Sequence, residues 1–304
     1  MINLNSKNSL ATKSLAKEFI SLPINSRIKT ITDYSSIIGV ARGTIQNSIK
    51  LMRTNGALEI KSKGHLGSFL VYKDLHLLLA FADIKFLVGV MPLPYSKKYE
   101  GLSHGILKSL EDKLSLPINM AYMRGAKKRI EMVLDERYDF AITSKYAALS
   151  YKNQNKNIDI VTEFGNETYV SRHIMITADR NFTSIENGMK VGVDRDSIDQ
   201  LNLTLYHTRN KDVELVNVNY NLIIQSLLNG TIDVAIWNGD ELRNKYTNLY
   251  FKDLDGYSDD NTIAVLLVKK DRHDLKKLIA DSLDVKEVVN LQRQVIENKI
   301  IPNY

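Results

Sequence analysis

One pattern constrains the fold of this chain more than any other: strand-like and helical segments alternate in the same order twice between residues 84 and 236. The strand-like segments are rich in β-branched residues, and the helical ones have apolar residues at helical spacing. The expected strands are 84–91, 117–123, 138–143, 189–193, 213–218 and 231–236. The expected helices between them are 99–114, 125–136, 197–206 and 220–228. This alternation predicts two α/β lobes, each with a parallel sheet and helices on both faces.

The third strands of the two copies have closely similar sequences. Tyr138-Asp139-Phe140-Ala141-Ile142 aligns with Ile232-Asp233-Val234-Ala235-Ile236, and each strand follows a helix with Ile and Leu on one face. Residues 158–179 and 260–270 are expected to cross between the lobes. Two such lobes resemble the type II periplasmic-binding-protein fold, an architecture that LysR-type effector domains share.

The region before residue 75 predicts a different fold. A helix is expected at 9–21, and a second helix is expected to start after the N-cap residue Thr30 and to end at Gly39. A third helix follows at 41–52 after a short turn, and residues 58–70 have the pattern of a β-hairpin with a basic, glycine-containing tip. This order is typical of a winged helix-turn-helix domain.

Charge is divided unevenly along the chain. Residues 1–80 contain 11 Lys and Arg against 4 Asp and Glu, so the remaining 224 residues contain 41 − 11 = 30 basic against 35 − 4 = 31 acidic residues. A basic module before a near-neutral body indicates a polyanionic partner for the first part alone. The chain has no Cys, no long uninterrupted apolar stretch, and no apolar signal-peptide core at residues 1–8. A cytoplasmic location is therefore expected.

Residues 27–70 resemble the winged helix-turn-helix of GntR-type bacterial transcription regulators. The resemblance rests on Gly39-Val-Ala-Arg42-Gly-Thr44-Ile, on Asn55-Gly56-Ala-Leu58-Glu and on Gly64-His-Leu-Gly67. Ala41 replaces the Ser that the family prefers, which removes a phosphate contact. Gln46 replaces a frequent Arg, which implies an altered base preference.

The third helix and the hairpin tip carry residue types that contact DNA. Arg pairs with guanine, and Asn or Gln with adenine, in the major groove, whereas Lys and Thr reach phosphates. The candidate DNA-binding residues are Arg27, Thr30, Arg42, Thr44, Gln46, Asn47, Lys50, Lys61, Lys63 and His65. A plain turn residue is an equal alternative for His65, and a winged helix that contacts only protein is the alternative for the whole module.

A GntR-like winged helix followed by a two-lobed domain resembles the YhfZ-type group of bacterial regulators. The expected fold class is α/β, with a DNA-binding domain at 1–75 and a two-lobed effector and dimerisation domain at 76–304. Lobe one is expected at about 84–165 with a return segment near 260–304, and lobe two at about 175–258. The expected partners are an operator in double-stranded DNA, a small-molecule effector and a second copy of the chain, with no membrane.

An effector is expected at the carboxyl ends of the strands, where open parallel sheets hold their ligands. Hydroxyls near helix starts and two Arg side chains favour an anionic metabolite. The candidate ligand-binding residues are Tyr95, Ser96, Arg124, Thr143, Ser144, Arg172, Asp194, Ser197, Tyr220 and Trp237. For each of them, a loop cap or a surface side chain is the structural alternative.

Enzymatic chemistry finds little support in the sequence. Gly101-Leu-Ser103-His-Gly105 has the form of a nucleophile elbow, but a polar segment precedes it where the motif requires a strand. The six His show no metal-ligand spacing, so neither a catalytic residue, a metal nor a cofactor is predicted.

The final helix, 284–298, is expected to pack on a partner subunit or on its own lobe.

Two alternatives to a ligand-responsive regulator are compatible with the sequence. The two lobes could form a solute-binding or enzymatic domain with an accessory winged helix. They could also have lost their ligand and serve only in assembly.

Overall fold

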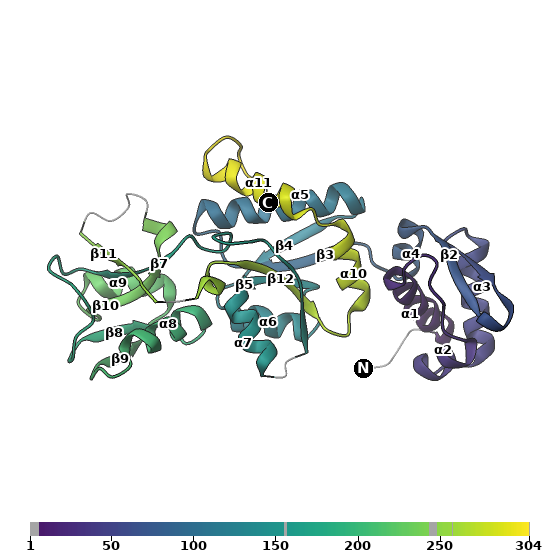
Figure 1. The fold of residues 1–304 in the computed structure, drawn as a ribbon, viewed down its shortest axis with the longest axis horizontal. Helices are drawn as coiled ribbons and strands as arrows, with labels where there is room; N and C mark the ends of the chain where they lie inside the picture. The colour runs from purple at the N-terminus through teal and green to yellow at the C-terminus, as the bar shows by residue number, and fades with distance from the viewer. Residues whose placement is uncertain (1–5, 155–156, 243–247, 257, 304) are drawn as a thin grey trace. The chain divides into compact units, whose positions relative to one another are not determined.

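The computed structural model describes residues 6–154, 157–242, 248–256 and 258–303. The chain divides into two compact units, and Figure 1 colours the ribbon by residue number from purple to yellow. The N-terminal unit comprises residues 1–87, 110–117 and 271–282, and the two-lobed unit comprises residues 88–109, 118–270 and 283–304. None of the described helices is long and apolar enough to cross a membrane.

The N-terminal unit contains the expected helices and hairpin. They are α1 (Lys7–Ser21), α2 (Ile31–Ile38), α3 (Arg42–Thr54), β1 (Leu58–Ser62) and β2 (Ser68–Lys73), followed by α4 (Leu75–Phe81). Thr30 and Asp33 form a reciprocal capping box at the start of α2. Gly39 ends this helix at φ 74°, a backbone conformation that glycine adopts without steric cost. The α2–α3 turn is therefore encoded by local sequence.

The first lobe of the two-lobed unit is built on a five-stranded sheet of order β4-β3-β5-β12-β6. Its strands are β3 (Leu87–Met91), β4 (Ile118–Tyr122), β5 (Phe140–Ser144), β6 (Ile158–Glu163) and β12 (Ala264–Lys269). Its helices are α5 (Lys97–Leu114), of which residues 110–114 fall in the N-terminal unit, α6 (Ala126–Leu134), α7 (Lys145–Asn153) and α11 (Val285–Ile296). The helix α10 (His273–Ser282) belongs to the N-terminal unit.

The second lobe repeats this arrangement with a sheet of order β11-β7-β10-β8-β9. Its strands are β7 (His173–Thr177), β8 (Lys190–Val193), β9 (Glu214–Asn217), β10 (Val234–Asn238) and β11 (Tyr250–Asp253). Its helices are α8 (Ile198–Thr208), α9 (Ile223–Leu228) and the short η2 (Tyr220–Leu222) and η3 (Gly239–Leu242).

Both sheets are mixed, which refines the expectation of parallel sheets. The pairs β3–β5, β8–β9 and β8–β10 are parallel, as the alternating pattern predicts. The strands from the crossing segments are antiparallel: β12 lies between β5 and β6, and β7 lies between β10 and β11. The expected α/β class with two lobes is confirmed.

The repeated Asp of the two similar strands has the same structural role in each lobe. A carboxylate oxygen of Asp139 accepts a hydrogen bond from the Val88 backbone N–H at 2.8 Å, and Asp233 accepts one from Lys190 at 2.7 Å. In return, the backbone N–H of Asp139 donates to the Val88 carbonyl, and that of Asp233 donates to the Lys190 carbonyl. Each Asp therefore aligns the third strand with the first, which explains the sequence similarity without any ligand.

The Gly-x-Ser-x-Gly sequence lies inside helix α5 and packs against α11. A Cβ atom at Gly101 would lie 2.8 Å from the Cα atom of Gln292, and one at Gly105 would lie 2.8 Å from the Val288 carbonyl oxygen. Ser103 is fully buried, and its hydroxyl lies 2.8 Å from the Tyr122 hydroxyl. The motif is therefore a site of close helix packing, and α11 packs on its own lobe.

Candidate functional site

The exposed face of α3 carries the side chains expected to read DNA. Ile45, Ile49 and Met52 are buried on the inner face of the helix. The expected side chains on the other face are all exposed except the half-buried Thr44; they are Arg42, Thr44, Gln46, Asn47 and Lys50. Exposure of this face is the geometry that a recognition helix requires.

The β1–β2 hairpin, which follows α3, adds exposed basic residues. Lys61, Lys63 and His65 are exposed at its tip, and the Lys63 ammonium lies 4.5 Å from the centre of the Phe69 ring. The exposed Arg27 lies against the same hairpin, because a Cβ atom at Gly67 would approach its Nε atom to 2.7 Å. The Thr30 hydroxyl is engaged in the capping box of α2.

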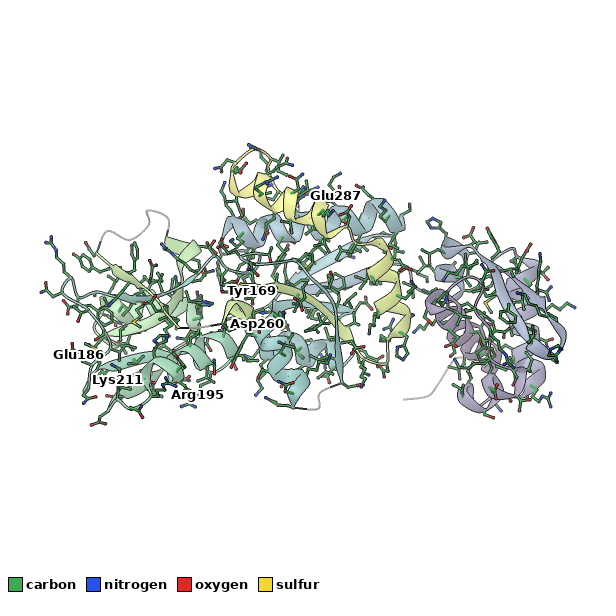
Figure 2. All side chains as sticks on the ribbon, in the orientation of Figure 1. Tyr169, Glu186, Arg195, Lys211, Asp260 and Glu287 are labelled. Carbon is green, nitrogen blue, oxygen red and sulfur yellow. The ribbon has the colours of Figure 1, made fainter. Side chains whose placement is uncertain are left out.

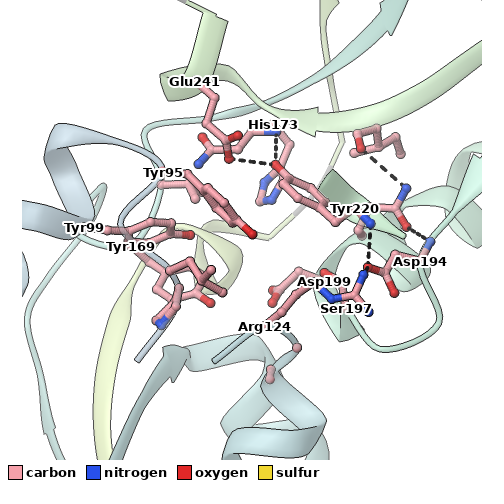
Figure 3. A pocket seen from close by; sticks show the side chains of 18 of the residues that line it. Tyr95, Tyr99, Arg124, Tyr169, His173, Asp194, Ser197, Asp199, Tyr220 and Glu241 are labelled. Carbon is pink, nitrogen blue, oxygen red and sulfur yellow. Dashed lines mark hydrogen bonds and ion pairs between the residues drawn. The ribbon is translucent and has the colours of Figure 1, made fainter. Parts of the chain in front are cut away.

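A cavity of about 650 Å³, including its opening to solvent, lies between the two lobes. The carboxyl ends of β3, β4, β8 and β10 and the first turns of the helices that follow them supply most of its wall. The polar and aromatic side chains in the wall are Tyr95, Tyr99, Arg124, Arg129, Tyr169, His173, Asp194, Ser197, Asp199, Gln200, Tyr220, Asn238 and Glu241. Figure 3 shows the tyrosine rings pointing toward one another across this space.

Ion pairs and hydrogen bonds join the two lobes at the edge of the cavity. Arg124 of lobe one lies 3.3 Å from Asp194 and 3.6 Å from Asp196 of lobe two, and Lys128 lies 2.8 Å from Asp196. Gly125 has φ 82°, and a Cβ atom there would lie 3.0 Å from the Asp196 carbonyl oxygen. The lobes are therefore in direct contact here, and a larger residue at position 125 would separate them.

A second link between the lobes is formed by Asp199, at the start of α8. Its carboxylate accepts hydrogen bonds from the Ser144 hydroxyl at 2.7 Å and from the Asn261 amide at 2.6 Å. Burial raises the pKa of Asp199 to about 6, although both hydrogen bonds and the nearby Arg129 oppose the shift. Asp199 is therefore a buried carboxyl group whose pKa lies close to neutral pH.

Burial also fixes the protonation of the neighbouring rings. It raises the pKa of Tyr99, Tyr169 and Tyr220, so their phenols stay neutral at physiological pH. Burial lowers the pKa of His173 to about 4, so its imidazole is neutral as well.

Half of the ten expected ligand-binding residues lie in the cavity wall; they are Tyr95, Arg124, Asp194, Ser197 and Tyr220. Arg195, which follows Asp194 directly, is exposed instead (Figure 2).

The other five expected residues lie elsewhere. Ser96 lines a small surface depression, and Arg172 is exposed and pairs with Asp253 at 2.9 Å. Trp237 stacks behind Tyr220, with ring centres 4.0 Å apart. Thr143 and Ser144 are buried, and Ser144 reaches the site only through Asp199.

Several wall residues escaped the sequence prediction. Tyr99, Arg129, Asp199 and Gln200 all lie in the first turns of helices that follow strands, so extending the search by one helical turn would have found them. Glu241 follows β10 in the same way. Tyr169 lies in the crossing segment between β6 and β7, and no sequence pattern marks it.

The fold and the cavity define a helix-turn-helix protein whose second domain has the fold of periplasmic binding proteins. The family described as YhfZ C-terminal domain matches residues 74–304, and a helix-turn-helix domain family matches residues 24–70. The chain belongs to the YhfZ family. It is 31% identical over 302 residues to the uncharacterized protein YhfZ of Escherichia coli (strain K12), and the match covers 98% of each chain.

Solved structures agree with this assignment. The crystal structure of YhfZ from Shigella flexneri is 32% identical and has a TM-score of 0.63, over 75% of this chain and 97% of that one. The amino acid ABC transporter substrate-binding protein AbpA from Streptococcus pneumoniae is 16% identical and has a TM-score of 0.54, over 72% of this chain and 96% of that one. The second likeness supports the two-lobed fold alone.

Proposed function

We propose that this protein is a cytoplasmic, homodimeric transcription regulator rather than an enzyme. Its winged helix would bind operator DNA in the manner of GntR-type regulators, and a small effector in the cavity between the lobes would modulate that binding. The observation that carries the proposal is the exposed polar face of α3, with Arg42, Gln46 and Asn47 beside a basic hairpin.

Two copies are proposed because one winged helix contacts too few base pairs for specificity. Two recognition helices spaced by one turn of DNA match a palindromic site. The effector is proposed to carry an anionic group. Arg124 supports this choice, because its guanidinium lines the cavity and can pair bidentately with a carboxylate or phosphate.

Selection of bound fragments from genomic DNA tests the DNA-binding role. Once an operator is known, Arg42→Ala is expected to reduce discrimination against altered sites by about 1–3 kcal/mol, because an Arg–guanine pair is lost. Lys63→Ala is expected to weaken binding to all sequences and to reduce the slope of log K against log salt by about 1, because a phosphate contact is lost.

The exposed Arg180 of the two-lobed unit provides a matched control, and Arg180→Ala is expected to bind like the wild type. If Arg42→Ala and Lys63→Ala also bind the operator like the wild type, the recognition-helix assignment fails.

A further inference from the structure

We propose that the effector is a small zwitterion: its anionic group faces Arg124, and a positively charged organic group lies among Tyr95, Tyr220 and Glu241. This inference rests on the proposed effector role of the cavity and assigns the chemical class of its ligand. It adds a cationic group to the proposed anion.

The N–H donors of Arg129 are already used within the protein. Its Nε atom donates to the Ile142 carbonyl at 3.1 Å, one terminal nitrogen to the Met123 carbonyl at 2.8 Å, and the other to the Tyr169 hydroxyl at 3.0 Å. The residue is 2% exposed. Its role is therefore to hold strand ends and a tyrosine ring in place. Arg124 pairs with Asp194 and Asp196 at 3.3 and 3.6 Å but is partly exposed to the cavity, so it is the guanidinium that can also face a ligand anion.

Among the described residues of the cavity wall, acidic side chains outnumber basic ones. The carboxylates of Asp194, Asp199 and Glu241 line it, against the guanidiniums of Arg124 and Arg129. His173 adds no positive charge, because burial keeps its imidazole neutral. In a partly enclosed space of low dielectric constant, this excess favours a ligand with a positive group.

The aromatic rings supply the surface that an organic cation prefers. Trp237 covers one face of the Tyr220 ring, with the two rings 3° from parallel, so only the opposite face is left for the cavity. Figure 3 shows the Tyr95 ring between Tyr220 and the Tyr99–Tyr169 pair. The negative face of an aromatic ring attracts an ammonium or guanidinium group, most strongly where water is excluded.

The two ends of the cavity differ in charge. The Tyr220 hydroxyl donates to Glu241 at 3.1 Å, so this carboxylate lies at the edge of the aromatic surface. Figure 3 shows Arg124 and Glu241 on opposite sides of the Tyr95 and Tyr220 rings. A molecule that carries a carboxylate at one end and an amine at the other matches this polarity, whereas a simple anion matches only the Arg124 end.

Calorimetric titration of the full-length protein with matched compounds tests the proposal. One set is n-butylamine, butyrate and γ-aminobutyrate; the other is n-hexylamine, hexanoate, ε-aminohexanoate and L-norleucine. Each set keeps one carbon skeleton and varies only the charged groups. We expect at least one amino acid to bind about tenfold or more tightly than the amine and the acid of its own set.

Glu241→Gln is the diagnostic variant, because the amide keeps the size of the side chain and an oxygen that can accept from Tyr220. It is expected to weaken binding of the amino acid about tenfold and to leave binding of the matching acid unchanged. Glu186→Gln is the matched control, because Glu186 is an exposed acidic residue of the same lobe outside the cavity wall (Figure 2). This control is expected to bind like the wild type.

Two results would overturn the zwitterion. One is binding of the acids as tightly as the amino acids, together with tighter acid binding by Glu241→Gln; the effector would then be a simple anion. The other is a lack of response to every compound in both sets. Neither result affects operator selection, so the proposed regulatory role is tested separately by the DNA experiment.

Discussion

Asp199 makes the stability of the two-lobed unit depend on pH. Its folded-state pKa of about 6 lies above the ordinary value of 3.8, so the folded chain binds this proton more tightly than the unfolded chain. The stabilisation is fully present below pH 3.8 and is lost as the pH rises through about 6. A shift of this size corresponds to about 3 kcal/mol.

As the pH rises from about 4 to about 7, the free energy of unfolding of Asp199→Asn is therefore expected to fall less than that of the wild type, because the variant has no proton to release there. Urea unfolding at a series of pH values measures the difference. Glu214→Gln, at the exposed start of β9, serves as the control and is expected to follow the wild-type curve. Parallel curves for Asp199→Asn and the wild type would show that Asp199 does not titrate in this range.

Single residues of the site were predictable where backbone direction determines their position. Asp194 directly follows β8, and Arg124 lies two residues beyond the end of β4, so the rule that ligands lie at strand ends was enough to find them. Trp237 follows the same rule, yet its ring packs behind Tyr220. Alternation along a strand gives the face on which a side chain lies, but not the neighbour that covers it. Tyr169 depends on tertiary packing alone.

At the scale of elements, the contact between α5 and α11 depends on two glycines. Gly→Ala in a helix ordinarily gains about 0.5–1 kcal/mol, because alanine restricts the unfolded chain and favours helix. At Gly101 and Gly105 the added methyl group would meet α11 backbone at 2.8 Å. Gly101→Ala and Gly105→Ala are therefore expected to destabilise the protein by about 1–3 kcal/mol.

Gly43 in α3 offers a matched control for this prediction. Within the described part of the chain, and apart from its chain neighbours and the backbone of its own helix, no atom lies within 4 Å of the position that an added methyl group would take there. Gly43→Ala is expected to gain the ordinary increment of helix stability. Chemical denaturation followed by circular dichroism compares the three variants. A gain at all three positions would mean that α11 moves aside at no cost.

Elements were predictable in proportion to the local signals that define them. Helix α2 has a capping box and a terminal glycine, and α3 has a regular apolar stripe; the expected limits of both lie close to the observed ones. The helices α4, α7 and α10 were not predicted. Strand β11 is exposed along its whole length, so it lacks the apolar alternation by which a strand is recognised. Antiparallel pairing of β7 and β12 depends on long-range contacts that no local pattern encodes.

At the scale of the whole molecule, two copies of the winged helix should leave a symmetric mark on DNA. Footprinting of the selected operator is expected to show two protected half-sites whose centres lie about 10 base pairs, or a multiple of that, apart. Sedimentation of the free protein is expected to give a dimer. A single protected half-site bound by a monomer would contradict the proposed assembly.

We expect effector binding and operator binding to be coupled. An effector regulates only if it binds differently to the states that do and do not hold DNA, and linkage then requires the same factor in both directions. If the effector changes operator affinity by a given factor, typically about 5–150-fold, the operator must change effector affinity by that factor. Titration of effector into protein alone and into the protein–operator complex measures it. Equal affinities in the two titrations would mean that the cavity binds a ligand without regulating DNA binding, and the two-lobed unit would then serve in assembly.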